Sequence, residues 1–234
     1  MSGIKKALTF SYDDGVTQDE RLIRIFNKYG IKGTFNLNSG LLGKPGELLR
    51  EGVSVNHTKV NPEDVKKIYE GHEVAVHTVT HPLLQNETDE EIIRQVEKDR
   101  ENLSKLVGYD VVGMAYPNTA PDKRVVRVVK EKTGVKYSRS PETTLSFNPS
   151  GDMFDYRGTI YHHGQWAQLF ETGKKFLELN PETAQIMYVW GHAYEFDIYP
   201  ERWKIFEQFC EMMSGRSDIF YGTNAQVFEK FGLI

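Results

Sequence analysis

Short β-prone runs alternate with helix-patterned stretches seven or eight times along this chain. The first unit shows the pattern: an apolar run at 7–12 is followed by helical spacing over 17–29 and by a short strand pattern at 33–38. Such alternation predicts a parallel sheet with helices outside it. The 234 residues show no internal repeat and no composition break. We therefore predict a single α/β domain over 1–234, either an open doubly wound sheet or a TIM-like barrel.

The same periodicities place the remaining elements. Strands are expected at 73–76, 111–116, 135–138, 154–160, 184–190 and 219–221. Helices are expected at 62–69, 88–107, 122–132, 166–179, 201–213 and 224–231. We expect a glycine-containing loop at 39–52, and the segment 139–165 has the weakest pattern.

Composition excludes several classes of protein. The net charge is -4 and no long basic run is present, which argues against a nucleic-acid partner. No run approaches the roughly 20 apolar residues of a membrane helix, so no membrane partner is expected. The single cysteine, Cys210, forms no internal disulfide and lies in a helical pattern, as a buried structural thiol does. No apolar leader precedes the first strand, and we expect a cytoplasmic protein. The oligomeric state stays open.

Polar residues follow several of the predicted strands at the point where each strand ends. These are Asp13 and Asp14, His77 and His81, Pro117 and Asn118, and His192. The carboxyl ends of parallel strands share one face, and sites are built there. Taken alone, the run at 13–15 is also typical of a simple turn. The expected convergence favours a functional site instead.

Two histidines with a carboxylate and open positions form a metal set suited to hydrolysis. His77 and His81 have the required spacing, and Pro82 biases His81 away from helical geometry. The alternative is a pair of partly buried structural histidines. The other four histidines are interpreted as structural: His57, His72, His162 and His163.

Together these motifs resemble the polysaccharide deacetylase family, which is carbohydrate esterase family four or the NodB-homology family. Residues 9–15 resemble its first motif, 77–81 its second and 190–192 its last. The resemblance implies a distorted (β/α)7-8 barrel and a divalent metal, zinc first, with cobalt or nickel as alternatives. By position, it implies Asp14, His77 and His81 as metal ligands, Asp13 as catalytic base and His192 as catalytic acid. The expected substrate-binding residues are Tyr116, Pro117, Asn118, Trp190 and Glu195.

The chain departs from the family pattern in its third and fourth motifs. Ala115 stands where the family has an arginine that orients the base, and Asn118 stands where an aromatic residue is usual. No Asp-Trp pair of the fourth motif is evident before residue 180. Arg139 and Arg157 are the two candidates to supply the missing guanidinium from another strand end.

The resemblance implies a metal-dependent hydrolase that removes acetyl groups from N-acetylated sugars. We expect a small carbohydrate or another N-acyl compound as substrate. One alternative is a metal-dependent hydrolase of a small non-sugar amide. Another is a non-catalytic carbohydrate-binding relative, which the missing third-motif arginine favours.

Overall fold

The computed structural model describes residues 3–149 and 151–234, so Met1, Ser2 and Ser150 of the predicted domain lie outside the described residues. The main sheet has nine strands. They are β1 (Lys6–Asp13), β2 (Gly33–Leu37), β5 (Glu73–Val76), β6 (Gly113–Ala115), β7 (Tyr137–Thr143), β8 (Tyr156–Gly158), β9 (Ile160–Tyr161), β10 (Gln185–His192) and β11 (Ile219–Tyr221). The α-helices are α1 (Asp19–Lys28), α2 (Val65–Ile68), α3 (Asp89–Val107), α4 (Lys123–Lys132), α5 (Trp166–Glu178), α6 (Glu201–Met213) and α7 (Asn224–Lys230).

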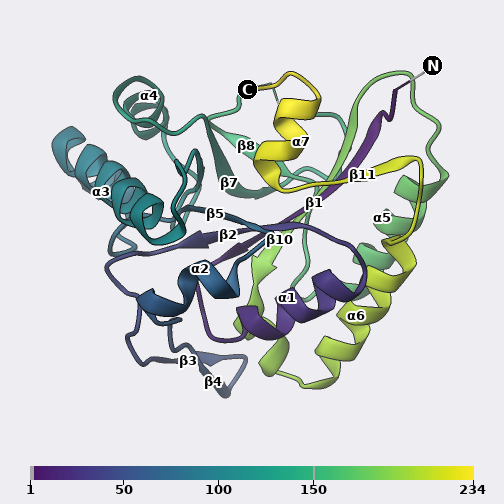
Figure 1. The fold of residues 1–234 in the computed structure, drawn as a ribbon, viewed down its shortest axis with the longest axis horizontal. Helices are drawn as coiled ribbons and strands as arrows, with labels where there is room; N and C mark the ends of the chain where they lie inside the picture. Colours follow the sequence, from purple (N-terminus) through teal and green to yellow (C-terminus); the bar gives the residue numbers. More distant parts are fainter. Residues whose placement is uncertain (1–2, 150) are drawn as a thin grey trace.

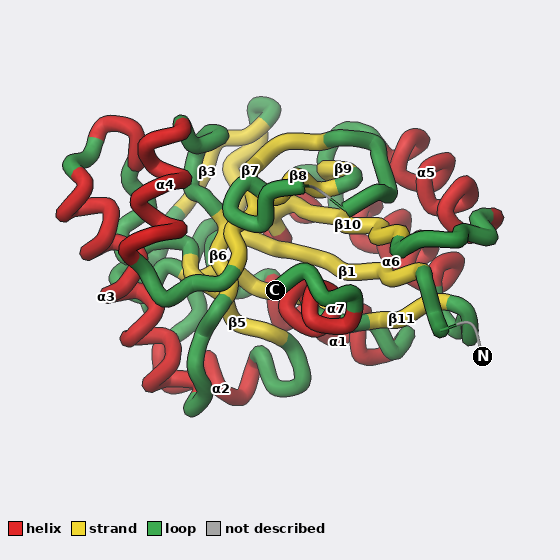
Figure 2. Tube along the Cα trace, turned by 90° about the horizontal axis from the view of Figure 1, so that it is seen from above, coloured by secondary structure: helices red, strands yellow, loops and turns green. Residues whose placement is uncertain are grey.

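The pairings within the main sheet are parallel, and helices α3 and α4 lie on one side of it with α5 and α6 on the other (Figures 1 and 2). The hydrogen-bonded order is β8-β7-β6-β5-β2-β1-β10-β9, with β11 beside the start of β1. Its first and last members, β8 and β9, are separated by Thr159 alone, whose amide donates to Tyr188 at 2.9 Å. The sheet therefore returns on itself through one bent segment. The predicted α/β fold is confirmed, and this path favours a distorted barrel over an open sheet.

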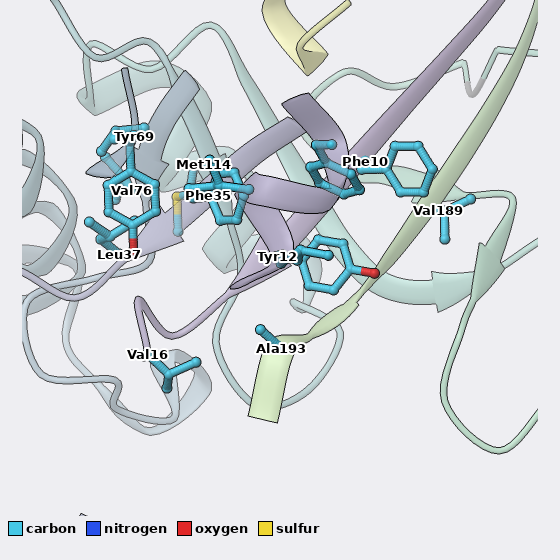
Figure 3. Packing of buried hydrophobic residues seen from close by; sticks show 14 of the residues in the cluster. Phe10, Tyr12, Val16, Phe35, Leu37, Tyr69, Val76, Met114, Val189 and Ala193 are labelled. Atoms are coloured by element: carbon cyan, nitrogen blue, oxygen red, sulfur yellow. The ribbon is translucent and has the colours of Figure 1, made fainter. Parts of the chain in front are cut away.

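Strand β1 is the centre of the core, since all eight of its residues are buried. The Phe10 ring lies 4.8 Å from that of Phe26 on α1, and the Tyr12 ring lies 6.3 Å from that of Phe35 on β2 (centroid distances). Figure 3 shows Phe10 and Tyr12 between β2 and the Val189 side chain of β10. Because neighbours on both sides hold β1, the two carboxylates at its end have a fixed position.

Several helix ends follow the sequence signals. The Thr88 hydroxyl accepts from the Glu91 amide at the start of α3, and Gly108 ends that helix with φ of 84°. The helix expected at 62–69 is shorter than predicted: a 3-10 turn, Pro62–Asp64, leads into the four residues of α2. No helix among the residues in view has the length and apolar character needed to span a membrane.

The prediction of a loop over residues 39–52 is partly wrong. Strand β3 (Glu47–Arg50) lies within it and pairs antiparallel with β4 (Val53–Asn56), at the lower edge of Figure 1. Gly52, with φ of 79°, makes the tight connection between them. The hairpin was missed because all four residues of β3 are at least partly exposed and show no alternation of apolar and polar side chains. Strand β7 also runs past the predicted end at 138, and the strand expected at 154–160 is divided into β8 and β9.

Candidate active site

The carboxyl ends of β1, β5 and β10 open into a cavity of about 690 Å³. The residues predicted as catalytic or metal-binding line this cavity together: Asp13, Asp14, His77, His81 and His192. They come from strands far apart in the sequence, which the parallel sheet brings to one face. The convergence predicted from the strand ends is therefore confirmed.

Asp14, His77 and His81 form a cluster whose possible ligand atoms all lie within 4.8 Å of one another. The Asp14 Oδ1 atom is 3.8 Å from His77 Nε2 and 3.7 Å from His81 Nε2. His77 Nδ1 lies 2.9 Å from the Ala115 carbonyl, so Nδ1 carries the proton and Nε2 is free to ligate. Ligand atoms that each lie roughly 2.0–2.2 Å from one ion can be up to about 4.4 Å apart, and both separations from Asp14 are shorter than that. These residues therefore suit a divalent metal.

The backbone is strained where two of these ligands are presented. Asp14 has φ of 84° and His81 has φ of 59°, a region that side chains other than glycine rarely adopt. The turn at Asp14 is held by its amide, which donates to Asn36 at 3.0 Å. Strain of this kind persists only where the surrounding structure enforces it, and it is concentrated at functional sites.

The protonation states of this cluster are those that a metal requires. Burial lowers the pKa of His77 to about 4, which keeps its imidazole neutral at physiological pH. Burial also lowers the pKa of His81. Burial alone would raise the pKa of Asp14, but the hydrogen bond from His57 and the charge of Lys59 hold it well below its usual value. The cluster thus offers two neutral imidazoles and one carboxylate.

Asp13 is buried beside the cluster and is held by an arginine. Arg139 Nη2 donates to both carboxylate oxygens of Asp13, at 2.5 Å for Oδ1, and Asn36 Nδ2 donates to Oδ1 at 2.8 Å. The Arg139 guanidinium also lies over the Trp190 ring, 4.6 Å from its centroid. Burial raises the pKa of Asp13, but the charges of Arg139 and His192 bring it below its ordinary value. Asp13 is therefore an ionised carboxylate.

Of the two arginines considered as replacements, Arg139 takes the position beside Asp13. Arg139 is the register partner of Ala115 on the neighbouring strand, so its side chain starts at the level where the family arginine would start. Arg157 instead forms surface ion pairs with Glu142 and Asp155, at 2.8 and 3.0 Å.

His192 lies at the end of β10, with Nε2 3.9 Å from Asp13 Oδ2. Glu195 contacts His192 twice: its Oε1 atom is 3.2 Å from His192 Nδ1, and its Oε2 atom accepts from the His192 amide at 3.0 Å. Burial would lower the pKa of His192, but the charge of Glu195 raises it to about 9. His192 is therefore a cation at neutral pH.

The predicted substrate-binding residues have different surroundings. Glu195 borders the cavity, but its oxygens are occupied by His192, by His162 Nε2 at 3.0 Å and by the Tyr161 hydroxyl. Glu195 is therefore placed to support His192 rather than to bind a substrate. In the described structure, Pro117 is buried and does not border the cavity.

The other three predicted substrate-binding residues lie at the wall or rim of the cavity. Trp190 stacks on Tyr161 with 4.4 Å between ring centroids. Tyr116 is buried and donates to the Phe154 carbonyl at 2.9 Å. Asn118 is exposed at the rim and donates to the His81 carbonyl at 3.2 Å.

His57 lies in a loop as expected, but its Nε2 atom lies 3.0 Å from Asp14 Oδ2 in the cavity wall, a contact that was not predicted. Lys59 and His163 also border the cavity and were not predicted. His72 and His162 are structural in their contacts: His72 accepts from the Gly33 amide at 3.1 Å, and His162 lies fully buried beside Glu195. Nothing in the sequence analysis pointed to His57, which follows directly after β4, a strand that was not predicted.

A sequence profile of the family described as polysaccharide deacetylase matches residues 2–138. Among solved structures, the fold is similar to that of a protein described as a probable polysaccharide deacetylase from Pseudomonas aeruginosa PAO1. The TM-score is 0.71 at 13% identity, with 97% of this chain and 91% of that chain covered. It is also similar to a family 4 acetyl xylan esterase from Clostridium thermocellum in complex with a cobalt ion. That TM-score is 0.61 at 13% identity, with 98% and 93% covered.

A third similar structure is the Streptococcus pyogenes deacetylase PplD in complex with acetate, with a TM-score of 0.51 at 16% identity. That match covers 63% of this chain and 61% of the other, so the chain spans less than two thirds of that relative's length. No curated protein matches this chain in sequence. At these identities the structural likenesses establish the fold alone.

Proposed function

This chain belongs to the polysaccharide deacetylase family, and from that premise we propose that it is a metal-dependent deacetylase acting on the N-acetyl group of an acetylated sugar. Enzymes of this family hydrolyse amide or ester bonds. The observation that carries the proposal is the cavity in which an ionised carboxylate, a protonated histidine and a metal-binding cluster face one another. In metal-assisted amide hydrolysis these three groups serve as the base, the acid and the site of the cation.

Asp14, His77 and His81 are the residues that would hold the metal. When bound, a divalent cation lowers the pKa of a water molecule and polarises the acyl carbonyl. Zinc suits this donor set, and cobalt and nickel are alternatives. The neutral state of both imidazoles and the ionised state of Asp14 prepare the cluster for such a cation.

Asp13 is placed to accept the proton of the attacking water. Arg139 and Asn36 fix both of its oxygens, so the carboxylate points into the cavity in one orientation. As the water oxygen forms its bond to the carbonyl carbon, the proton passes to Asp13. General-base help of this kind contributes roughly 10²–10⁴-fold to the rate.

His192 is placed to donate a proton to the departing nitrogen when the C–N bond breaks. Glu195 keeps it protonated, since the pKa of about 9 lies above physiological pH. The products are acetate and a free amine. Trp190 and Tyr161, which stack on each other, form the aromatic part of the cavity wall.

Arg139 also weakens the case for a non-catalytic relative, because the guanidinium missing at Ala115 is supplied by the neighbouring strand. The alternative of a small non-sugar amide keeps the same site and differs only in substrate. A screen of N-acetylated sugars against small amides separates these two substrate classes.

The proposal is tested by measuring metal content and turnover in matched variants. We expect Asp13→Asn and His192→Ala to retain about one equivalent of metal and lose most activity. His77→Ala should lose the metal as well. Normal turnover by Asp13→Asn would refute the assignment of the base, and absence of metal from the parent protein would refute metal dependence.

A further inference from the structure

We propose that the segment following β4 sets the metal affinity of the site, with His57 orienting Asp14 for a cation and Lys59 opposing the cation. The inference rests on the proposed metal dependence. It concerns two residues that belong to none of the sequence motifs. Both act on the same carboxylate, in opposite directions.

The backbone fixes this segment against the turn that carries Asp14. Lys59 forms an isolated antiparallel bridge with Val16, and the Thr17 amide donates to the Thr58 carbonyl at 2.9 Å. The Val60 amide donates to Gly15 at 2.9 Å. Positions 57 and 59 are two apart in extended chain, so their side chains project toward the same face. That face is the wall of the cavity beside Asp14.

His57 divides the two oxygens of Asp14 between different partners. Its Nε2 atom donates to Oδ2 at 3.0 Å, whereas Oδ1 faces His77 and His81 at 3.8 and 3.7 Å. The imidazole itself packs edge-on against Tyr194, with 5.1 Å between ring centroids. The carboxylate therefore cannot rotate freely, and Oδ1 is left as the ligand atom. Loss of such an outer partner typically weakens metal affinity about 10–100-fold.

Lys59 places a second cation at the oxygen that a metal would use. Its Nζ atom is 3.8 Å from Asp14 Oδ1 and 3.2 Å from His57 Nε2, and the residue is only 6% exposed. Water therefore screens its charge little. An ammonium and a divalent cation that share one carboxylate oxygen repel each other. Removal of the ammonium should tighten metal binding.

The experiment is a zinc titration of the metal-stripped full chain against a chromophoric chelator of known affinity. We expect His57→Ala to bind zinc about 10–100-fold more weakly than the parent. His57→Gln, whose amide can still donate to Oδ2, should lie between the two. Lys59→Met should bind about tenfold more tightly, as a nearby like charge shifts an ionic equilibrium by at least that factor. His163→Ala is the matched control, since His163 borders the same cavity but pairs with Glu51 at 2.8 Å.

Thermal unfolding without zinc identifies any variant that fails to fold, and His57→Leu then replaces His57→Ala as a donor-free side chain of similar bulk. Zinc affinity equal to the parent's in the donor-free variant would overturn the inference. Weaker binding by Lys59→Met, or an equal loss in His163→Ala, would also overturn it. If the parent binds no zinc, cobalt or nickel, the proposed function fails together with the inference. If the parent binds and the variants do not differ, the inference fails alone.

Discussion

Replacement of Arg139 by methionine tests how the proposed base is kept ionised. Arg139 is fully buried, and of its three guanidinium nitrogens only Nη2 has a hydrogen-bonding partner among the described residues, namely Asp13. Methionine fills a similar volume and keeps apolar contact with Trp190, but it carries no charge. The variant therefore leaves a buried carboxylate beside the proposed metal site without its cationic partner.

The substitution should change both the stability of the protein and the ionisation of Asp13. Removing one member of a buried ion pair costs about 3–5 kcal/mol, because the other charge stays buried and uncompensated. The second effect is on ionisation: burial raises the pKa of Asp13, and Arg139 is the largest influence that lowers it. Without that charge the pKa of Asp13 should rise. The acid limb of kcat/KM should therefore move to higher pH.

The ion pair between Arg139 and Asp13 determines how the stability of the parent protein changes with pH. Because the folded-state pKa of Asp13 is depressed, its contribution to stability is fully present above the unfolded pKa of about 3.9. That contribution is lost as the pH falls through the folded-state value. In Arg139→Met the contribution should vanish, so the difference in stability between the two proteins should be larger at pH 7 than at pH 3.

The assay combines a pH profile of kcat/KM with urea unfolding at both pH values. Arg157→Met is the matched control, since that arginine pairs only at the surface and should change stability by less than about 1 kcal/mol. Arg139→Met/Asp13→Asn removes both charges and should recover most of the stability without recovering activity. The reasoning is refuted if Arg139→Met keeps the acid limb of the parent, or if it is no less stable than Arg157→Met.

Four further outcomes are expected. Chelation should abolish turnover, and zinc, cobalt or nickel should restore it; full activity of metal-free protein would contradict this expectation. His192 has a raised pKa, so its contribution to stability is present below about pH 6.5 and is lost as the pH rises through about 9. Glu195→Gln should move the basic limb of the rate profile to lower pH. An unchanged limb would argue against the support of His192 by Glu195. In Gly191→Ala the added Cβ would lie 2.6 Å from the His162 ring, so that ring must shift and its 3.0 Å contact with Glu195 is disturbed. Kinetics should show a lower kcat at normal metal content. Phe10→Ala should cost about 3–5 kcal/mol in urea unfolding because it leaves a cavity in the core.

The strand ends that carry the site could be read from sequence because each is a sharp boundary between an apolar run and polar residues. Asp13 follows such a run, and so do His77 and His192, and the structure brings all three to one cavity. The hairpin of β3 and β4 had no such boundary, since most of its side chains are at least partly exposed. His57 was therefore assigned to a loop. Its contact with Asp14 depends on how the chain between the two residues folds, which local sequence pattern does not reveal.

The contact between Arg139 and Asp13 bears on the architecture as well as on the chemistry. Along the order β7-β6-β5-β2-β1, the two strands are four spacings apart, which is about 19 Å in a flat sheet at about 4.8 Å per strand. An arginine side chain does not cover that distance, yet its guanidinium bonds directly to Asp13. The sheet must therefore curl until β7 and β1 face each other across its interior, as the bent segment through Thr159 allows. The charge that position 115 lacks can thus come from position 139, because the curled sheet lets neighbouring strands reach the same interior point.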